Sequence, residues 1–428
     1  MVGVETRRQS RGPLYTLFAA NAISFVGNNL TNIAIPWFVL VTTGSAAKTG
    51  ITLFFSITPI VIVGFFGGAL VDRLGYKRTS IIADLASGVT VAAIALCHQF
   101  DVLSFPLLLA LVFLSALLDA PGGTARAALV PDLAKLGDVP IDRASASIQV
   151  VERGARLIGA PLGGVLIAVF GPAGVLWIDA LTFAVSAGMV SVAIPGSART
   201  SSHHSSDGYI ADLKSGLGFI RRDRLIFAIV GTIMVTNLLD AVFTVCLPFL
   251  AKEVYDSSVA LGLLAAASGG GAVVGAIVYG TIGRRTSRRA VFIPAFAIAG
   301  ARGLPLATLP VLPVAIAVQV VVGLAAGPLN PILAAVEYER IPEHMRGRVF
   351  GAMQAGAWMA MPLGVLAGGY LIEQFGLPTT FLVTSLCYLA TTLTMVINPA
   401  FHDMDRRPAG EHASFDVPPG DADASLRA

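Results

Sequence analysis

Ionisable side chains inside apolar segments are the residues of this sequence that could do chemistry. Asp240 lies in the segment TNLLDAVFTVCLP, and Asp179 lies in the apolar run 174–194. A carboxyl group in a low-dielectric environment can exchange a proton near neutral pH. Glu152 and Arg156 are four residues apart, which places them on one helix face. Asp240, Glu152 and Asp179 are therefore candidate proton carriers.

Each of these acids also has a structural alternative. Asp240 could instead anchor its helix to a neighbour through a hydrogen bond. For Asp179 we favour a role in packing and hydrogen bonding. For Glu152 and Arg156 we favour an ion pair near a helix end over participation in a gating network.

Two further charged residues belong to the apolar segments. Arg302 precedes Gly303 and Pro305, so we expect an irregular helix there. It can snorkel to the membrane surface, or contact an acid or a bound molecule, and snorkelling is the interpretation we favour. Asp119 ends the run 104–120 and is expected at the membrane interface.

Amide side chains form a stripe on the first apolar segment, where Asn21, Asn28 and Asn32 share one helix face. A polar stripe on an apolar helix should face a cavity and not lipid. With amides and an aromatic residue from other segments, the predicted cavity-lining set is Asn21, Asn28, Asn32, Asn237, Gln319, Asn330, Gln354 and Trp358.

The elements that carry these residues are predicted to be transmembrane helices. Of the 428 residues, 55% are hydrophobic and 13% are charged, against roughly 25% charged in soluble domains. A spanning helix needs about 20 mostly apolar residues. Twelve runs meet this condition: 14–42, 50–71, 79–98, 104–120, 146–170, 174–194, 225–250, 258–282, 290–308, 312–336, 347–371 and 377–397. The predicted fold class is an all-α membrane protein.

Lys and Arg residues predict the orientation. They are abundant in the even-numbered loops and at both ends of the chain, whereas the odd-numbered loops contain only Lys48 and Lys252. By the positive-inside rule, both termini are cytoplasmic and the protein is a multi-pass protein of the cell membrane.

A weak internal repeat predicts two six-helix bundles. A shift of 212 residues places Pro36 on Pro248, and a shift of 211 places Lys77 and Arg78 on Arg288 and Arg289. The predicted organisation is a first bundle at 1–195, a cytoplasmic linker at 196–222, a second bundle at 223–398 and a disordered tail at 399–428.

The loop between the second and third runs resembles the cytoplasmic signature of the major facilitator superfamily, a family of transporters. The residues that carry the resemblance are Gly68, Asp72, Arg73, Gly75, Lys77 and Arg78. The resemblance implies a gate in which Asp72 meets the positive end of the eleventh helix, in the other half of the molecule.

A second motif resembles the antiporter motif of the same family. It comprises Arg156, Gly159, Pro161, Gly163 and Gly164, with Ala160 where the family has another glycine. The stretches ARAALVPD, GLGFI and RGRV resemble the drug-exporter branch that includes macrolide efflux and actinobacterial Tap-type pumps. That branch often has an acid at the position of Asn28, and the family's arginine in helix four is absent from 104–120, so we turn to Asp240 for proton coupling.

These observations predict a secondary transporter that exports drug-like or natural-product molecules in exchange for protons. A dedicated exporter or importer of one metabolite is the alternative, and a membrane sensor is a weaker one. The sequence has no phosphate-binding loop and no nucleophile–base pair, so we expect no enzyme activity and no cofactor. His203 and His204 have no further ligands nearby, so no metal site is expected. The expected partners are a small molecule, protons and the bilayer, without nucleic acid, and the expected state is a monomer.

Overall fold

The computed structural model describes residues 11–195 and 209–405, apart from the side chains of 64–74, 209–212 and 284. Almost all of the described residues lie in helices, and none of them lies in a strand. Ten of these helical segments are long and apolar enough to cross a membrane. An all-helical membrane protein is therefore confirmed, with ten candidate spans where the sequence predicts twelve.

The two longest candidate spans contain a break. In α5, Gly171 has φ 71° and ψ 165°, and in α14, Gly376 has φ 77° and ψ 164°. Both conformations lie outside the helical region and favour glycine, which has no Cβ. Each glycine therefore interrupts one helical segment, where the sequence analysis expects a turn between two spans.

The helices of the first half of the described chain are α1 (Gly12–Thr43), α2 (Ala46–Leu74), α3 (Tyr76–Gln99), α4 (Phe105–Leu136) and α5 (Ile141–Ala193). Those of the second half are α6 (Tyr209–Arg222), α7 (Arg224–Glu253), α8 (Ser258–Ile282), α9 (Arg288–Ala301), α10 (Gly303–Leu306), α11 (Leu312–Ala326), α12 (Leu329–Arg340), α13 (Arg346–Trp358) and α14 (Met361–Ile397). Short 3₁₀ helices occur at Gly283–Arg285 (η1), Glu343–Met345 (η2) and Pro399–Met404 (η3).

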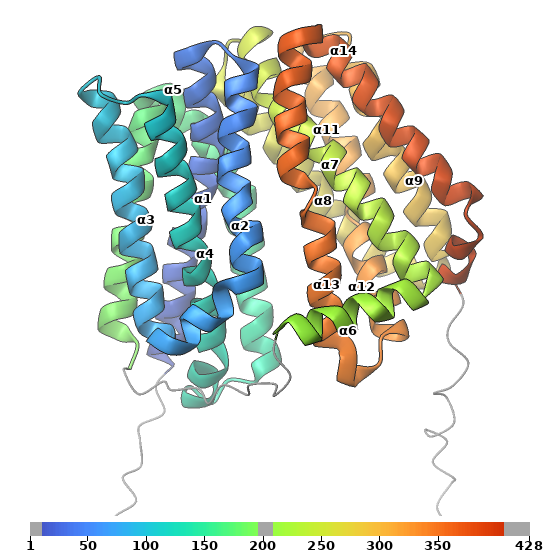
Figure 1. Cartoon of the computed structure of the whole chain (residues 1–428), viewed down its shortest axis with the longest axis horizontal. Helices are drawn as coiled ribbons and strands as arrows, with labels where there is room; N and C mark the ends of the chain where they lie inside the picture. The colour runs from blue at the N-terminus through green and yellow to red at the C-terminus, as the bar shows by residue number, and fades with distance from the viewer. Residues whose placement is uncertain (1–10, 196–208, 406–428) are drawn as a thin grey trace, which may run out of the picture.

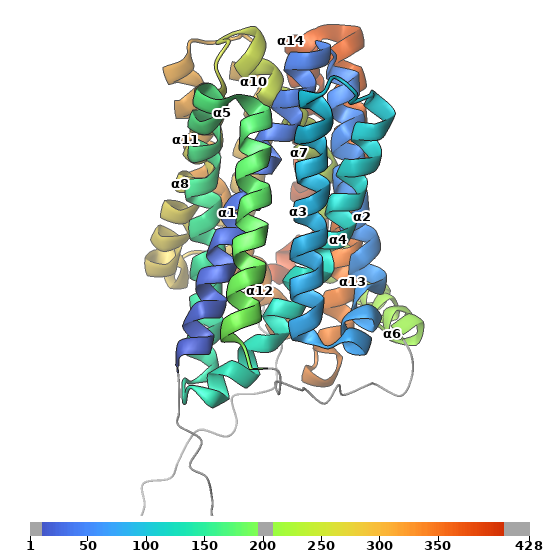
Figure 2. The same ribbon diagram turned by 90° about the vertical axis from the view of Figure 1, so that its left-hand side faces the viewer.

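Figure 1 shows α1 to α5 on the left and the helices of the second half on the right. We call the end at which α1 passes into α2 the upper end, and the end at which α1 begins the lower end. The helix α6 lies across the lower end of the second half (Figure 1), and Figure 2 shows the first half from its own side.

Glycines bring the two halves together near the upper end. A Cβ added to Gly369 of α14 would lie 2.6 Å from the Ala46 carbonyl oxygen and 3.0 Å from Gly50 Cα of α2. A Cβ added to Gly164 of α5 would lie 2.5 Å from the Ser258 carbonyl oxygen of α8. Small residues allow this backbone approach in membranes, where dispersion contacts drive helix association.

The helix α4 is longer than its sequence predicts. It continues beyond Asp119 to Leu136, with Pro121 inside it. Prolines are tolerated in membrane helices because neighbouring groups satisfy the freed backbone. The expectation that Asp119 ends this helix at the interface is therefore wrong, and Arg126, which appeared to follow the helix, lies within it.

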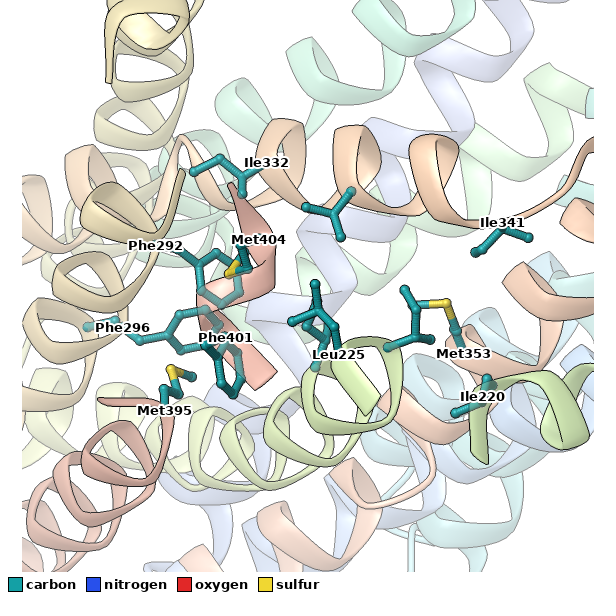
Figure 3. Close-up of a cluster of buried hydrophobic side chains, with 14 of the residues drawn as sticks. Ile220, Leu225, Phe292, Phe296, Ile332, Ile341, Met353, Met395, Phe401 and Met404 are labelled. Atoms are coloured by element: carbon teal, nitrogen blue, oxygen red, sulfur yellow. The ribbon is translucent and has the colours of Figure 1, made fainter. Parts of the chain in front are cut away.

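The linker and tail also contain more structure than predicted. The second part of the predicted linker forms α6, and the start of the predicted disordered tail forms η3. In η3, Phe401 and Met404 are each 1% exposed and point into a cluster with Phe292 and Met395, as Figure 3 shows. Residues 196–208 and 406–428 lie outside the described part of the chain.

The glycine contacts between the halves lead to a stability prediction. In Gly164→Ala and Gly369→Ala, each new methyl group would meet backbone atoms of another helix, and the helices would have to separate. Overpacking of this kind typically costs about 1–3 kcal/mol. We expect a lower melting temperature of the purified protein for both variants. Gly188→Ala is the matched control, because its Cβ would meet no heavy atom within 4 Å. Equal melting temperatures for the three variants would contradict this packing.

Candidate functional site

The second half contains a cavity of about 440 Å³ that we call the central cavity. Asp240 of α7 and Arg302 both line it, and their side chains form an ion pair. The Asp240 carboxylate is 39% exposed, and the Arg302 side chain is 14% exposed. The acid of this pair is therefore open to the cavity, while the guanidinium is mostly covered.

The position of Arg302 follows from an irregular helix, as predicted. The helix α9 ends at Ala301 and the short α10 begins at Gly303. The Gly303 N–H donates to Ser385 Oγ at 2.9 Å, and a Cβ at Gly303 would meet that oxygen at 2.3 Å. This tight contact with α14 fixes the backbone that carries Arg302.

Two aromatic residues complete the environment of the pair. The Arg302 guanidinium carbon lies 3.8 Å from the centroid of the Phe243 ring, a cation–π arrangement. The Tyr388 hydroxyl donates to Asp240 Oδ2 at 3.4 Å. Our preference for a snorkelling Arg302 is therefore wrong, because an acid in the protein interior attracts the guanidinium more strongly than the distant membrane surface.

A second cavity, which we call the mouth cavity, has a volume of about 680 Å³. It shares Ile233, Asn237, Asn330 and Leu333 with the central cavity. Gln149 of the first half lines it together with residues of α7, α12 and α13. The two cavities therefore adjoin, and the mouth cavity lies between the two halves.

The predicted cavity-lining residues of the second half all lie on these cavities. Gln319 lines the central cavity, Gln354 and Trp358 line the mouth cavity, and Asn237 and Asn330 line both. Gln319 Oε1 has no hydrogen-bond partner among the described residues. An unsatisfied buried acceptor in a cavity is a ready partner for a bound molecule or a water.

Glu337 is a cavity residue that the sequence analysis missed. It is half-buried on the wall of the mouth cavity, beside the aromatic residues Tyr338, Phe350 and Trp358. Within the described part of the chain, its carboxylate has no hydrogen-bond or ion-pair partner. The nearest arginines in sequence are engaged elsewhere: Arg340 with Asp223 and Arg346 with Glu343.

The first half contains a buried ion pair that was also missed. Arg126 of α4 and Asp84 of α3 are 1% and 0% exposed, and Arg126 Nη1 lies 2.5 Å from Asp84 Oδ1. Ser186 donates to the same carboxylate at 2.7 Å, and Arg126 donates to Ser24 at 3.3 Å. The network ties α1, α3, α4 and α5 together, and it shows that α4 does carry an arginine.

The polar stripe of α1 faces two acids of the first half, Asp119 and Asp179. Asn28 donates to Asp119 Oδ2 at 3.0 Å, and Thr31 donates to Asp179 Oδ2 at 2.5 Å. Asp179 is fully buried and also accepts from Thr182 at 3.1 Å. Asn21 is 1% exposed and its amide has no hydrogen-bond partner among the described residues, whereas Asn32 is exposed.

The antiporter-motif glycines lie at helix contacts. A Cβ at Gly159 would meet Asn29 Cβ at 2.6 Å, and one at Gly163 would meet Ile33 Cβ at 3.5 Å, both on α1. Pro161 lies against Gly262 of α8, next to the Gly164 contact. Glu152 and Arg156 form an exposed pair at 2.7 Å. Exposed pairs of this kind contribute little to stability.

The loop motif is described only in part. Gly75 has φ 79° before α3, and Lys77 Nζ donates to the Ser191 carbonyl at 2.8 Å and to the Ile194 carbonyl at 2.5 Å. Lys77 thus binds the last carbonyls of α5, where a helix favours a cation, and Arg78 is exposed. The side chains of Asp72 and Arg73 and the surroundings of Gly68 lie outside the described part of the structure.

The described residues include no group of three or more His, Cys, Asp and Glu side chains that could hold a metal ion. The three cysteines, Cys97, Cys246 and Cys387, are free thiols.

Comparison with known proteins agrees with this arrangement. The family model of the Major Facilitator Superfamily matches residues 17–355 and 234–418. The multidrug efflux pump Tap of Mycobacterium tuberculosis is 31% identical over 423 residues, covering 97% of this chain and 100% of the relative. Macrolide efflux protein A of Streptococcus pyogenes is 21% identical over 382 residues, covering 86% of this chain and 92% of the relative.

Among solved structures, that of the nucleoside transporter NupG superimposes with a TM-score of 0.76 at 12% identity. The match covers 91% of this chain and 99% of that one, and it shows a shared fold. The family match spans most of the chain and the Tap relative is matched over its full length. The chain therefore belongs to the Major Facilitator Superfamily.

Proposed function

We propose that this protein exports drug-like or natural-product molecules across the cell membrane in exchange for protons. The observation that carries the proposal is the Asp240–Arg302 pair, which places a half-exposed acid in a cavity within apolar helices. The 31% identity to the Tap pumps over 97% of the chain supports drug efflux over other transport classes.

The proposed topology has twelve spans in two bundles of six. A helix rises about 1.5 Å per residue, so the 53 residues of α5 would extend about 80 Å, against about 30 Å of hydrocarbon. Counting α5 and α14 as two spans each, divided at Gly171 and Gly376, raises ten candidate spans to twelve. The bundles are then residues 1–195 and 223–398, and the surplus of Lys and Arg at the lower end favours cytoplasmic termini.

The proposed state is inward-facing. The glycine contacts lie near the upper end, and the mouth cavity lies between Gln149 of the first half and residues of α12 and α13. Transport would follow when the halves rock about the fixed site and open the upper end. In this cycle, Asp72 would latch the lower end against α13 when that end closes. Both cavities are built within one chain, so a monomer suffices.

In the proposed coupling, a proton and the Arg302 guanidinium compete for the Asp240 carboxylate. When Asp240 is ionised, it holds the guanidinium over Phe243. When Asp240 takes up a proton, the attraction is lost and Arg302 can move within the cavity. The central cavity therefore has a different shape and charge when Asp240 is protonated than when it is ionised. Because of this difference, proton binding and drug binding can oppose each other. Glu152 and Asp179 remain weaker candidates, one exposed and one enclosed by hydroxyl groups.

Transport into proteoliposomes across a compound panel, with and without a pH gradient, tests the proposal. A multidrug exporter moves several unrelated compounds and responds to the gradient. Movement of one metabolite only would favour the alternative of a dedicated transporter. Equal flux in empty liposomes would contradict transport altogether.

Asp240→Asn separates proton coupling from drug binding. Asparagine resembles the protonated acid, so gradient-driven export should fall at least about tenfold, which corresponds to about 1.4 kcal/mol. Exchange of labelled for unlabelled drug without a gradient should persist. Gradient-driven export and drug exchange by the variant are the two measurements.

The matched control is Asp256→Asn, because Asp256 is 77% exposed and, among the described residues, forms an ion pair only with Lys252. It should leave both activities unchanged. The double variant Asp240→Asn/Arg302→Gln removes both charges and shows whether a lone arginine impairs folding. Full gradient-driven export by Asp240→Asn would overturn Asp240 as the coupling group.

The charge of the mouth cavity favours cationic drugs. Glu337 supplies one carboxylate beside aromatic rings, and no Lys or Arg is among the described residues that line this cavity. Glu337→Gln should weaken transport of a cationic dye by about tenfold and leave the transport of a neutral compound of similar size unchanged.

A transport assay that contains both compounds measures the difference. Glu253→Gln, an exposed acid outside both cavities, is the control, and an equal loss for both compounds would contradict a charge-based role.

A further inference from the structure

A third hollow lies outside the two cavities, on the surface of the second half. It is a groove of about 870 Å³ between the lower part of α7 and the end of α14, bordered by the end of α6 and by η3. Its lining residues are Arg221, Arg224, Phe227, Ala228, Gly231, Thr232, Val235, Ala390, Thr391, Thr394, Asn398, Pro399, Ala400 and Asp403. None of them lines the central or the mouth cavity.

The groove has an apolar channel along one stripe of α7. Phe227 and Val235 are 58% and 39% exposed. Between them lies Gly231, and a Cβ added there would meet no heavy atom within 4 Å, so the groove is hollow at this point. The stretch from Arg224 to Val235 spans about 16 Å of helix, which is long enough for a large part of an acyl chain.

The lower end of the groove is basic. Arg221 belongs to the last turn of α6 and Arg224 begins α7, and both are exposed without an acidic partner among the described residues. The acid between them, Asp223, is engaged elsewhere. It accepts from the Leu225 N–H at 2.9 Å and pairs with Arg340 at 3.1 Å.

Asp403 is the one acid among the described residues that line the groove, against the two arginines, so the lining keeps a net positive charge. Asp403 accepts a hydrogen bond from Arg340 through its backbone carbonyl at 3.1 Å. Thr394 donates to the Thr391 carbonyl at 2.6 Å. The helix α6, which ends at these arginines, lies across the lower end of the second half in Figure 1, as expected of a helix at a membrane surface.

We propose that this groove is a binding site for an anionic phospholipid of the leaflet at the lower end. The lipid phosphate lies between Arg221 and Arg224, and one acyl chain follows Phe227, Gly231 and Val235 along α7. Basic pockets between transmembrane helices at the membrane surface recognise acidic headgroups in this way. The site is separate from the central cavity, because α7 turns Asn237 and Asp240 to the central cavity and a different face to the groove.

Native mass spectrometry of the purified protein tests the site. The protein is titrated with phosphatidylglycerol and with phosphatidylcholine of the same acyl chains. The wild type should retain phosphatidylglycerol preferentially, and Arg221→Gln/Arg224→Gln should lose this preference by about tenfold. Arg143→Gln/Arg153→Gln, which removes two exposed arginines of the first half, should behave as the wild type. Equal phosphatidylglycerol binding by all three proteins would overturn the proposal.

Two further arms separate the headgroup from the chain. Gly231→Phe fills the hollow and leaves both arginines in place, so it should also weaken phosphatidylglycerol binding. Glycerol phosphate, which has no acyl chain, should not compete. Full competition by glycerol phosphate, or unchanged binding by Gly231→Phe, would contradict a lipid site. The melting temperature of each variant in phosphatidylcholine shows that it is folded.

Discussion

The contact of glycine backbones between the two halves is the constraint on which the rest of the structure depends. Gly50 of α2 meets Gly369 of α14, and Gly262 of α8 meets Gly164 of α5. At these distances the helix backbones are in van der Waals contact, so dispersion contacts contribute to the joining of the halves. Hydrogen bonds add to them, from the Ser258 hydroxyl to the Gly164 carbonyl at 2.9 Å and from the Ser45 hydroxyl to Glu373 at 3.1 Å. Such an interface can hold two bodies together and still let them turn about each other. It also lies away from the cavities, which leaves the space between the halves open for binding.

The two halves differ in how their interior ionisable side chains are paired. In the first half, Arg126 pairs with Asp84, and Asp119 and Asp179 accept from side chains of α1, so each acid is enclosed and has a partner. In the second half, Asp240 has an ionic partner and also faces a cavity. A buried pair is costly to break, which suits a rigid frame. In a pair at a cavity wall, the acid can exchange its basic partner for a proton, which would suit the proposed coupling.

The sequence predicted an all-helical membrane protein and its family, because apolar run length and motif spacing are local properties. It failed where tertiary contacts override local signals. The apolar run 104–120 predicted a helix that ends near Asp119, but α4 continues to Leu136, which hid Arg126 and misplaced Asp119. Arg302 was expected at the surface because its partner Asp240 is 62 residues away. The second copy of the antiporter glycines, at Gly364, Gly368 and Gly369, was visible at a shift of 205 residues and was overlooked.

The central claim is that the halves rock about the glycine contacts, and distance measurements between spin labels test it most directly. In a protein without its native cysteines, one label pair at Val150 and His344 reports on the lower end, and another at Val102 and Val311 reports on the upper end. All four positions are exposed. The account predicts that acidification or a transported drug shifts the two distances in opposite directions, one shorter and one longer. Distances that stay constant, or that change in the same direction at both ends, would contradict it.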